Sequence, residues 1–248
     1  MPPRLNLFTN RQRANSFGGA AENYDAYRPR YPDQLIDDVL APRARRVLEG
    51  GAGTGIASMQ LIERGADLLA VEPDARMAAV ARAKGIPVEL STFEDWDPAG
   101  RRFDLVVFAA SFHWVDPAVA LPKIRGILDE GGKLALIWNR LRPTNPTRAE
   151  FEKIYADYMD VETRSGDGSP DEVVDMIAAH GFTVTQHKYP HDLHFSAENW
   201  ADIAFTFSNQ LLVPQDKAPE LRARLIETIG PAGVSVGGDA VAIFATPA

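Results

Sequence analysis

Four glycines fall within six positions in the segment VLEGGAGTGIAS, residues 47–58, directly after a short apolar run. Glycine inside a helix or strand is destabilising by roughly 0.5–1 kcal/mol relative to alanine, so this much backbone freedom needs a reason. In open α/β sheets, ligands bind at the carboxyl ends of the strands, where a following helix also offers its positive N-terminus. We therefore expect a loop whose backbone N–H groups approach a nucleotide-like ligand.

Two common nucleotide motifs are absent from this loop. The dinucleotide pattern G-x-G-x-x-G fails, because its sixth position holds isoleucine when counted from Gly51 and serine when counted from Gly53. No G-x-x-x-x-G-K-[ST] phosphate loop occurs in the sequence either. The pattern present is E-x-G-x-G-x-G, from Glu49 to Gly55.

Strand and helix patterns alternate around the glycine loop. Short apolar runs predict strands at residues 46–50, 68–72, 87–90, 103–109 and 133–139. The stretches between them predict helices at residues 56–65, 74–85 and 117–132. Continuous apolar strands are typical of a parallel sheet that is covered on both faces. The alternation therefore predicts an α/β fold with a doubly wound sheet.

The second part of the chain has a different pattern. It begins with an expected loop, RLRPTNPTR, at residues 140–148. We expect helices at residues 147–162, 170–182, 196–210 and 218–229, and strands at 182–190 and 240–247. The sequence contains no internal repeats and no low-complexity segment.

Composition excludes several classes of protein. The 248 residues contain no cysteine, which rules out disulfides, thiolate metal sites and cysteine nucleophiles. The formal net charge of -8 argues against nucleic-acid binding, which usually needs a basic face. The apolar runs are too short to span a membrane, and the N-terminus lacks the apolar core of a signal peptide. We expect a cytoplasmic protein without nucleic-acid or membrane partners.

Several motifs resemble those of the class I S-adenosylmethionine-dependent methyltransferases. VLEGGAGTG resembles their motif I, and AVEPDARM (70–77) resembles their second motif. FDLVVFAASFHWVDP (103–117) and ILDEGGKLALIWN (127–139) resemble the motifs around strands four and five. FGGAAENYDAYRPRYP (17–32) resembles the N-terminal segment of a bacterial small-molecule group, the methyltransferase type 11-like proteins. Five such elements in order and at the family's spacing are far more specific than motif I alone.

The sequence departs from the family's pattern at two places. Asp129 and Glu130 replace the usual basic-Pro pair before strand five, which changes turn chemistry but no ligand contact. Gly50 stands where the family usually has a hydrophobic residue. We expect this glycine to loosen the packing of the first strand.

The resemblance implies a single methyltransferase domain over residues 1–248, with a Rossmann-like sheet of seven strands, the last one antiparallel. Residues 1–42 would form an N-terminal lid segment and helix, and inserted cap helices at 143–165 and 196–230 would cover the substrate. The implied activity is methyl transfer from S-adenosylmethionine, with S-adenosylhomocysteine as product, to the oxygen, nitrogen or carbon of a small organic acceptor. The implied setting is small-molecule biosynthesis by a monomer or homodimer.

The resemblance also assigns residues to the cofactor. Glu72 lies 19 positions after Gly53, the spacing that a clamp on the ribose hydroxyls needs. Glu49 would brace the glycine loop near the methionine amino group, and Tyr24 and Arg28 would cover the methionyl end. The full expected cofactor-binding set is Tyr24, Arg28, Glu49, Gly51, Ala52, Gly53, Glu72, Pro73, Met77, Thr92, Phe93, Glu94 and Ala109.

Some of these positions have alternative interpretations. Phe93 can stack on the adenine or belong to the core, and Arg28 can be a lid residue or a surface charge. His113 is the candidate general base, because the pKa of histidine lies near working pH. Alternatively, His113 and Trp114 shape the pocket and pack against the cofactor.

Three histidines have a spacing that suggests a zinc site, but their setting argues against one. His187, His191 and His194 fall on an expected strand end and on a turn interrupted by Pro190, so they do not share a helical face. We expect no metal.

The acceptor site is expected to be aromatic and largely uncharged, which suits a small organic molecule rather than a protein tail or a tRNA. The aromatic residues of the cap helices are Tyr155, Tyr158, Trp200, Phe205 and Phe207.

Two other functions stay open. The chain can bind S-adenosylmethionine for different chemistry, such as a cyclisation. It can also be an NAD(P)-dependent oxidoreductase, which the failed dinucleotide pattern disfavours.

Overall fold

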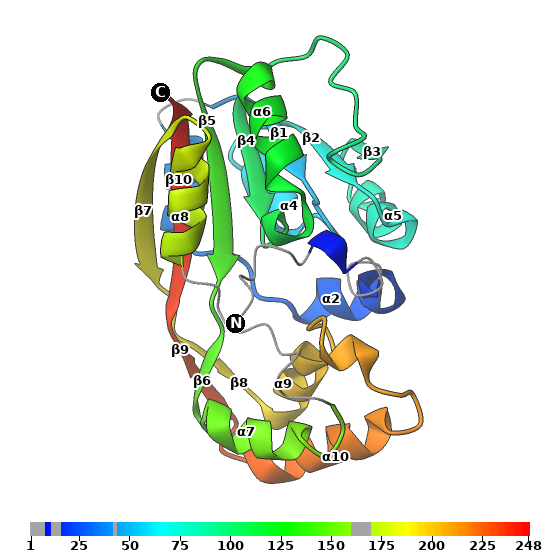
Figure 1. Cartoon of the computed structure of the whole chain (residues 1–248). Helices are drawn as coiled ribbons and strands as arrows, with labels where there is room; N and C mark the ends of the chain where they lie inside the picture. Colours follow the sequence, from blue (N-terminus) through cyan, green and yellow to red (C-terminus); the bar gives the residue numbers. More distant parts are fainter. Residues whose placement is uncertain (1–7, 11–15, 42–43, 160–169) are drawn as a thin grey trace.

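The computed structural model describes residues 8–10, 16–41, 44–159 and 170–248, and it is built around a seven-stranded sheet (Figure 1). The strand order is β3-β2-β1-β4-β5-β10-β7. The strands are β1 (Arg46–Gly50), β2 (Asp67–Glu72), β3 (Val88–Leu90), β4 (Phe103–Ala109), β5 (Leu128–Asn139), β7 (Phe182–Pro190) and β10 (Asp239–Pro247). β1 pairs in parallel with β2 and β4, whereas β10 runs antiparallel to β5 and β7. This confirms the predicted doubly wound sheet with an antiparallel last strand.

Helices cover both faces of this sheet. Residues on successive positions of β1 face opposite sides, so Leu48 belongs to one buried cluster and Val47 to the other. The cluster of Val47 includes side chains from α3 (Asp33–Leu40), α4 (Ile56–Ile62) and α5 (Ala75–Ala83). The cluster of Leu48 includes side chains from α6 (Pro117–Ile127) and α8 (Pro170–Ala179). Both faces are therefore buried, which explains the continuous apolar strands.

One helix ends earlier than the sequence predicts. We expected a helix over residues 117–132, but α6 stops at Ile127 and β5 begins at Leu128, which pairs with Phe103 of β4. Gly131 then adopts a positive φ of 76°. A Cβ on Gly132 would lie 3.0–3.2 Å from three backbone carbonyl oxygens. The glycine pair thus lets the chain turn close to the neighbouring strand, which a continuing helix could not do.

Gly50 does not loosen the first strand, contrary to the expectation. A Cβ on Gly50 would lie 2.3 Å from Cε1 of Phe108 on the neighbouring strand β4. The buried ring of Phe108 fills that space and packs edge-on against Phe93 and Phe112, with centroids 4.9 and 5.1 Å away. An aromatic side chain on β4 therefore supplies the volume that the glycine lacks.

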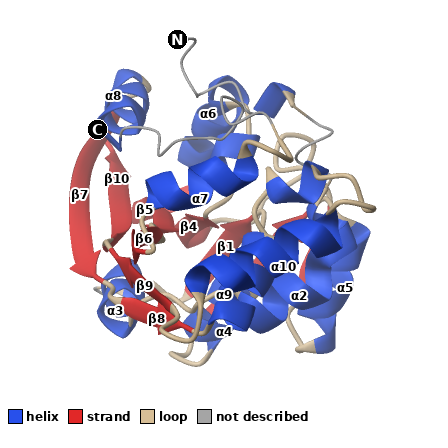
Figure 2. Cartoon of the chain, turned by 90° about the horizontal axis from the view of Figure 1, so that it is seen from below, coloured by secondary structure: helices blue, strands red, loops and turns tan. Residues whose placement is uncertain are grey.

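A second, smaller unit lies beyond the carboxyl ends of the main strands; we call it the cap (Figure 1). It contains a three-stranded sheet in the order β6-β9-β8 and three α-helices. Its elements are β6 (Arg142–Asn145), α7 (Arg148–Tyr155), β8 (Leu193–Phe195), α9 (Ala197–Ala204), α10 (Ala218–Ile229) and β9 (Val234–Gly237). These helices and strands share a buried cluster of their own. Seen from below, α7, α9 and α10 lie across the ends of the main sheet (Figure 2).

The small sheet was not predicted from the sequence. The expected loop at 140–148 contains β6, and β8 and β9 fall in stretches that we assigned to no element. α10 has the predicted bounds, whereas α7 and α9 lie within their predicted ranges and are shorter. Of the ranges predicted for the lid (1–42) and the first cap helix (143–165), some residues lie outside the described part of the chain: 1–7, 11–15, 42 and 160–165.

The N-terminal segment lies between the main sheet and the cap (Figure 1). It forms η2 (Phe17–Ala20) and α2 (Ala21–Tyr27), and α2 contacts both α5 and α9. Residues 28–32, which we call the strap, then lead into α3 in an arginine- and proline-rich sequence. Within the described ranges, no helix is both long enough and apolar enough to cross a bilayer.

Candidate functional site

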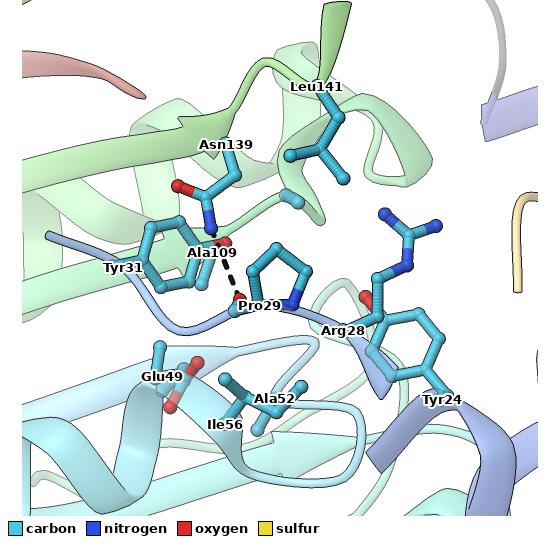
Figure 3. Close-up of a pocket in the computed structure, with 12 residues that line it drawn as sticks. Tyr24, Arg28, Pro29, Tyr31, Glu49, Ala52, Ile56, Ala109, Asn139 and Leu141 are labelled. Atoms are coloured by element: carbon cyan, nitrogen blue, oxygen red, sulfur yellow. Dashed lines mark hydrogen bonds between the residues drawn. The ribbon is translucent and has the colours of Figure 1, made fainter. Parts of the chain in front are cut away.

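A pocket lies where the carboxyl ends of β1, β4 and β5 meet the N-terminal segment and the cap (Figure 3). The space between its lining atoms is about 490 Å³ when the solvent at its open mouth is counted, so the pocket is only partly closed. Its lining residues are Tyr24, Arg28, Pro29, Tyr31, Glu49, Ala52, Ile56, Ala57, Ala109, Ala110, Asn139 and Leu141. Five of these belong to the set predicted for the cofactor: Tyr24, Arg28, Glu49, Ala52 and Ala109. The pocket therefore joins the expected cofactor side of the sheet to the expected acceptor side.

The glycine loop between β1 and α4 is held in a conformation that needs glycine. Gly51 has a φ of 66° and Gly53 a φ of 58°, in the left-handed region that side chains disfavour. The Gly51 N–H donates to the carbonyl oxygen of Val71 on β2 at 2.7 Å. A Cβ on Gly51 would lie 2.7 Å from the Cβ of Ser111, whereas one on Gly53 would lie 3.4 Å from Cε of Met77. Backbone angle and space both exclude a side chain at Gly51.

Glu72 lies at the end of β2 and faces this loop. Its carboxylate accepts hydrogen bonds from the backbone N–H of Gly53 at 2.8 Å and of Asp74 at 2.9 Å. Burial raises the pKa of Glu72, while these two N–H groups act in the opposite direction. A carboxylate has about four acceptor positions, so two stay available for hydroxyl donors. This arrangement fits the pair of ribose hydroxyls that Glu72 is predicted to bind.

Glu49 is the buried carboxyl group at the end of β1. The Ser58 hydroxyl donates to its Oε2 at 2.5 Å, and its Oε1 has no hydrogen-bond partner among the described residues. Burial raises the pKa of Glu49 to about 8. Because Glu49 lines the pocket, a ligand ammonium group there would satisfy the unpaired oxygen and stabilise the charged carboxylate. The residues present thus fit the methionyl end of S-adenosylmethionine.

After β3, one predicted cofactor residue is buried in the core and two form hydrogen bonds with nearby residues. Phe93 is only 3% exposed and packs in the main core, which is one of its two predicted roles. The Thr92 hydroxyl donates to the Asp95 carboxylate at 2.8 Å, and Glu94 accepts from the backbone N–H of Asp116 at 3.0 Å. An adenine at this loop would therefore meet Thr92, Glu94 and backbone groups rather than the Phe93 ring.

Arg28 is half-buried and points into the pocket region next to the cap (Figure 3). Its Nε donates to Oγ1 of Thr206 at 2.8 Å, and its Nη2 donates to the Thr206 carbonyl oxygen at 2.9 Å. The guanidinium carbon lies 4.2 Å from the ring centroid of Phe207 and 5.0 Å from that of Tyr24. Burial lowers the pKa of Arg28. The predicted alternative of a surface charge is wrong, because Arg28 connects α2 to the end of α9.

The helical part of the N-terminal segment is attached to the cofactor side by side chains. Lys84, which follows the last residue of α5, pairs with Asp25 of α2 and also donates to the Thr54 carbonyl oxygen at 2.9 Å. The Phe17 ring lies 5.9 Å from that of Trp114, centroid to centroid. These contacts place the segment over the glycine loop, as a lid requires.

The strap is held differently, through its backbone. The buried Gln60 accepts from the Tyr31 N–H at 2.9 Å and donates to the Tyr31 carbonyl oxygen at 2.8 Å. Asn139 at the end of β5 donates to the carbonyl oxygen of Pro29 at 3.2 Å (Figure 3). It also donates to the carbonyl oxygen of Arg30 at 3.1 Å. The strap is therefore a fixed wall of the pocket.

His113 is not among the described residues that line the pocket. It lies in η3 (Phe112–Trp114), and its ring packs 4.8 Å from that of Trp114, centroid to centroid. Trp114 in turn contacts Phe17 of the lid. This position agrees with the alternative in which the His-Trp pair shapes the site.

Each of the three histidines with zinc-like spacing contacts a different part of the structure. His187 packs against Phe244, His191 bonds through its N–H to the Gly238 carbonyl oxygen, and His194 lies 3.5 Å from the Ser235 hydroxyl. In the described part of the chain, no three histidine, aspartate or glutamate side chains gather in a way that could hold a metal ion.

Several pocket residues were not predicted from the sequence. Asn139 ends a predicted strand next to the strand of Ala109, so its place at the carboxyl edge of the sheet could have been inferred. Ala110 adopts a positive φ of 54°, which is unusual for a residue with a side chain and has no signal in the sequence. Thr206 is separated from Arg28 by 178 positions, and no local pattern connects the two.

The part of the chain that contains the glycine loop is similar to known methyltransferases. Residues 48–136 match the family model of a methyltransferase domain. An uncharacterized methyltransferase of Mycobacterium tuberculosis is 44% identical over 127 residues, which cover 50% of this chain and 52% of that protein. The chain thus spans about half the length of the curated relatives it matches first.

Solved structures share the fold over most of the chain. A candidate type II methyltransferase from Anaeromyxobacter dehalogenans has a TM-score of 0.62 at 18% identity, covering 89% of this chain and 98% of that one. A glycopeptide N-methyltransferase complexed with S-adenosylmethionine has a TM-score of 0.52 at 16% identity, covering 87% and 92%. Residues 48–136 of the chain therefore carry a methyltransferase domain, and most of the chain shares the fold of methyltransferases that use S-adenosylmethionine as cofactor.

Proposed function

We propose that this chain transfers a methyl group from S-adenosylmethionine to a small organic acceptor by in-line displacement. One observation supports this most directly. The pocket that contains Glu49 and Ala52 of the cofactor side also contains Arg28 and Leu141, which adjoin the cap. A cofactor bound at the glycine loop would therefore share a single enclosed space with an acceptor.

The chain's own residues would divide the binding of the cofactor among them. Glu72 would accept hydrogen bonds from the ribose hydroxyls, and Glu49 would accept from the methionyl ammonium group. The glycine loop would bring its backbone close to the ligand, while Tyr24 of the lid and Arg28 of the strap would cover it. When bound, the cofactor supplies an activated methyl group on a sulfonium that carries its own leaving group.

The protein must then align the acceptor and exclude water. Alignment alone can lower a barrier by about 7–11 kcal/mol in favourable cases, so a dedicated base is not always needed. The strap, held by Gln60 and Asn139, and the lid, held by Lys84, would close the space around the reacting groups. If a proton has to be removed, His113 remains the predicted base, acting from the edge of the site.

We propose the whole chain as one methyltransferase domain in which the cap encloses the acceptor. Of the predicted cap aromatics, Phe207 packs against the pocket residue Arg28, whereas Tyr155 and Trp200 are buried in the cap's own core and do not line the pocket. The apolar lining residues Pro29, Ile56 and Leu141 support a small molecule rather than a nucleic acid as acceptor. A cytoplasmic monomer or homodimer is the corresponding assembly.

Two measurements test the proposal. Calorimetric titration with S-adenosylmethionine, S-adenosylhomocysteine and NADH should give binding of the first two and none of the third. A methyl-transfer assay on a panel of phenols, amines and carboxylic acids should then give S-adenosylhomocysteine with at least one acceptor. Binding of NADH alone would support an oxidoreductase, and cofactor binding without transfer to any acceptor would support other chemistry.

A further inference from the structure

Arg28 is the one basic residue among the described residues that line the pocket. Within the described part of the chain, no carboxylate lies within ion-pair distance of its guanidinium, and burial lowers its pKa. A cation that is removed from water is costly unless an anion pairs with it. The proposed function supplies that anion, because the methionyl carboxylate of the cofactor is expected at this end of the pocket.

Thr206 of the cap holds this cation without neutralising it. Nε of Arg28 donates to Oγ1 of Thr206 at 2.8 Å, and Nη2 donates to the Thr206 carbonyl oxygen at 2.9 Å. The Thr206 hydroxyl gives its own proton to the carbonyl oxygen of Ile203 at 2.6 Å. A hydroxyl has one proton and two lone pairs, so donation to Ile203 leaves the lone pairs to accept from Arg28. The last turn of α9 therefore fixes the hydroxyl in the orientation that binds the guanidinium.

These two contacts occupy one edge of the guanidinium and leave the other free. Arginine carries five N–H donors in a planar fork, and Thr206 uses Nε and one N–H of Nη2. Among the described residues, Nη1 has no hydrogen-bond partner. The edge formed by Nη1 and Nη2 can pair with both oxygens of a carboxylate. An acidic side chain in the place of Thr206 would also hold Arg28, but it would compete with the ligand for its charge.

We propose that Thr206 is a positioning residue for the cofactor, which orients Arg28 so that its free edge binds the methionyl carboxylate. The proposal rests on the proposed methyltransferase function, and it extends the cofactor site to a residue 178 positions away in the cap. Thr206 is fully buried, so it would act only through Arg28 and touch neither the cofactor nor the acceptor. Recognition of the cofactor's carboxylate would then depend on the cap being in place.

Calorimetric titration with three ligands tests this role. The ligands are S-adenosylhomocysteine, decarboxylated S-adenosylhomocysteine, and methylthioadenosine, which lacks the whole amino-acid group. We expect the unaltered protein to prefer the first over the second by about 10- to 100-fold, the range for hydrogen bonds to a charged group. Thr206→Val should reduce this preference by about 3- to 10-fold, the range for one hydrogen bond. Its affinity for methylthioadenosine should change less than about twofold, because that ligand does not reach Arg28.

Two further variants separate positioning from support of the cap. Thr206→Ser keeps the hydroxyl and should restore the preference. Ser196→Ala is the matched control, because it removes the N-cap at the other end of α9, where the Ser196 hydroxyl accepts from the Asn199 N–H at 3.2 Å. The control weakens the same helix and should keep the preference. If Thr206→Val fails to fold, Thr206→Ala makes the same comparison.

A double variant shows whether Thr206 acts through Arg28. Arg28→Met should remove the preference for the carboxylate, and adding Thr206→Val to it should change the preference no further. If Arg28→Met fails to fold, Arg28→Lys replaces it; because lysine lacks the guanidinium fork, adding Thr206→Val should then reduce the preference less than it does in the unaltered protein.

The outcomes that overturn the proposal differ from the one that contradicts the proposed function. An unchanged preference in Thr206→Val would overturn the proposal. An equal loss of affinity for all three ligands would also overturn it, because Thr206 would then only support the cap. So would an unaltered protein that binds both homocysteine ligands equally well. Failure of the unaltered protein to bind S-adenosylhomocysteine would instead contradict the proposed function.

Discussion

On the cofactor side of the pocket, the contacts come from one stretch of chain, between Glu49 and Glu72, and several are made by backbone groups. On the cap side, Arg28 meets Thr206 across 178 positions of sequence, and the contacts are made by side chains. The first kind of site depends on backbone angles that few sequences allow. The second depends on how separate segments fold together. The cofactor side is therefore the more constrained by local sequence, and the cap side is free to differ in the acceptor it selects.

The largest expected effect is the loss of cofactor binding when the backbone of the glycine loop is disturbed. Gly51→Val should abolish binding of S-adenosylhomocysteine, because it combines a disfavoured φ of 66° with a Cβ only 2.7 Å from that of Ser111. Gly65→Val is the matched control: φ is 88°, but nothing lies within 4 Å of its Cβ. The control should lose about 1–2 kcal/mol of stability and keep its affinity. Calorimetric titration and thermal unfolding distinguish the two, and a Gly51→Val protein that folds and binds would contradict the role of the loop.

The next effect concerns the pH dependence of stability. Burial raises the pKa of Glu49 to about 8 from its ordinary value of 4.5. Between these values the folded protein holds a proton that the unfolded chain has lost. The free energy of unfolding therefore falls as pH rises through this window, by up to about 1.4 kcal/mol per pH unit.

Glu49→Gln should remove this contribution, so the variant should gain stability relative to the unaltered protein as pH rises toward 8. Urea unfolding at a series of pH values from about 5 to 8.5 measures it. Glu63→Gln, at an exposed carboxylate paired with Arg30, should keep the original slope. Identical slopes in the unaltered protein and in Glu49→Gln would show that the carboxyl group is already ionised in the folded state.

A smaller effect is expected at the ribose clamp. Glu72→Ala should weaken binding of S-adenosylhomocysteine by roughly 1.5–3 kcal/mol, the range for hydrogen bonds to charged groups. The same change leaves the N–H groups of Gly53 and Asp74 without their acceptor, so some loss of stability should accompany it. Asp67→Ala, at the opposite end of β2, serves as the control and should bind normally. An unaltered dissociation constant in Glu72→Ala would remove Glu72 from the cofactor site.

The smallest expected effect is a difference between the lid and the strap. Residues 17–27 are attached mainly through side chains, whereas residues 29–31 are bonded through their backbone to Gln60 and Asn139. Hydrogen exchange of residues 17–27 should slow when S-adenosylhomocysteine binds, because ligand contacts would stabilise the closed lid. Exchange at the strap should change little. Equal rates with and without ligand over residues 17–27 would make the whole segment a structural brace.

The sequence predicted the main sheet well because its signals are local. The strands at 46–50 and 103–109 have the predicted bounds. The helix predicted from residue 74 begins at Ala75, where Asp74 caps it by accepting from the N–H groups of Arg76 and Met77. The small sheet escaped prediction because its strands have three or four residues and form only through pairing between distant segments. Short pairings of this kind leave no periodic pattern to detect.

The site shows the same division. The glycine loop, Glu49 and Glu72 were predicted from motif and spacing, and the structure places them together at the edge of the sheet. The roles of Tyr31 and Thr206 were not predicted, since the first depends on Gln60 and the second on Arg28, both far away in sequence. The side chain of Phe93 was predicted to lie either at the adenine or in the core, and only the packing around Phe108 decides for the core.

The close approach of Phe108 to Gly50 has an evolutionary consequence. A Cβ on Gly50 would lie 2.3 Å from Cε1 of Phe108, so the Phe108 ring fills the space that a side chain at position 50 would need. Because the core is closely packed, the side-chain volumes at these two positions depend on each other. A homologue with a larger residue at position 50 has to carry a smaller one at position 108, and the two changes are unfavourable singly. Across the family, substitutions at these neighbouring strands should therefore occur in pairs, and the order in which they arise should be restricted to intermediates that tolerate a cavity. In this chain, the size of the side chain at position 50 is therefore limited by the ring at position 108.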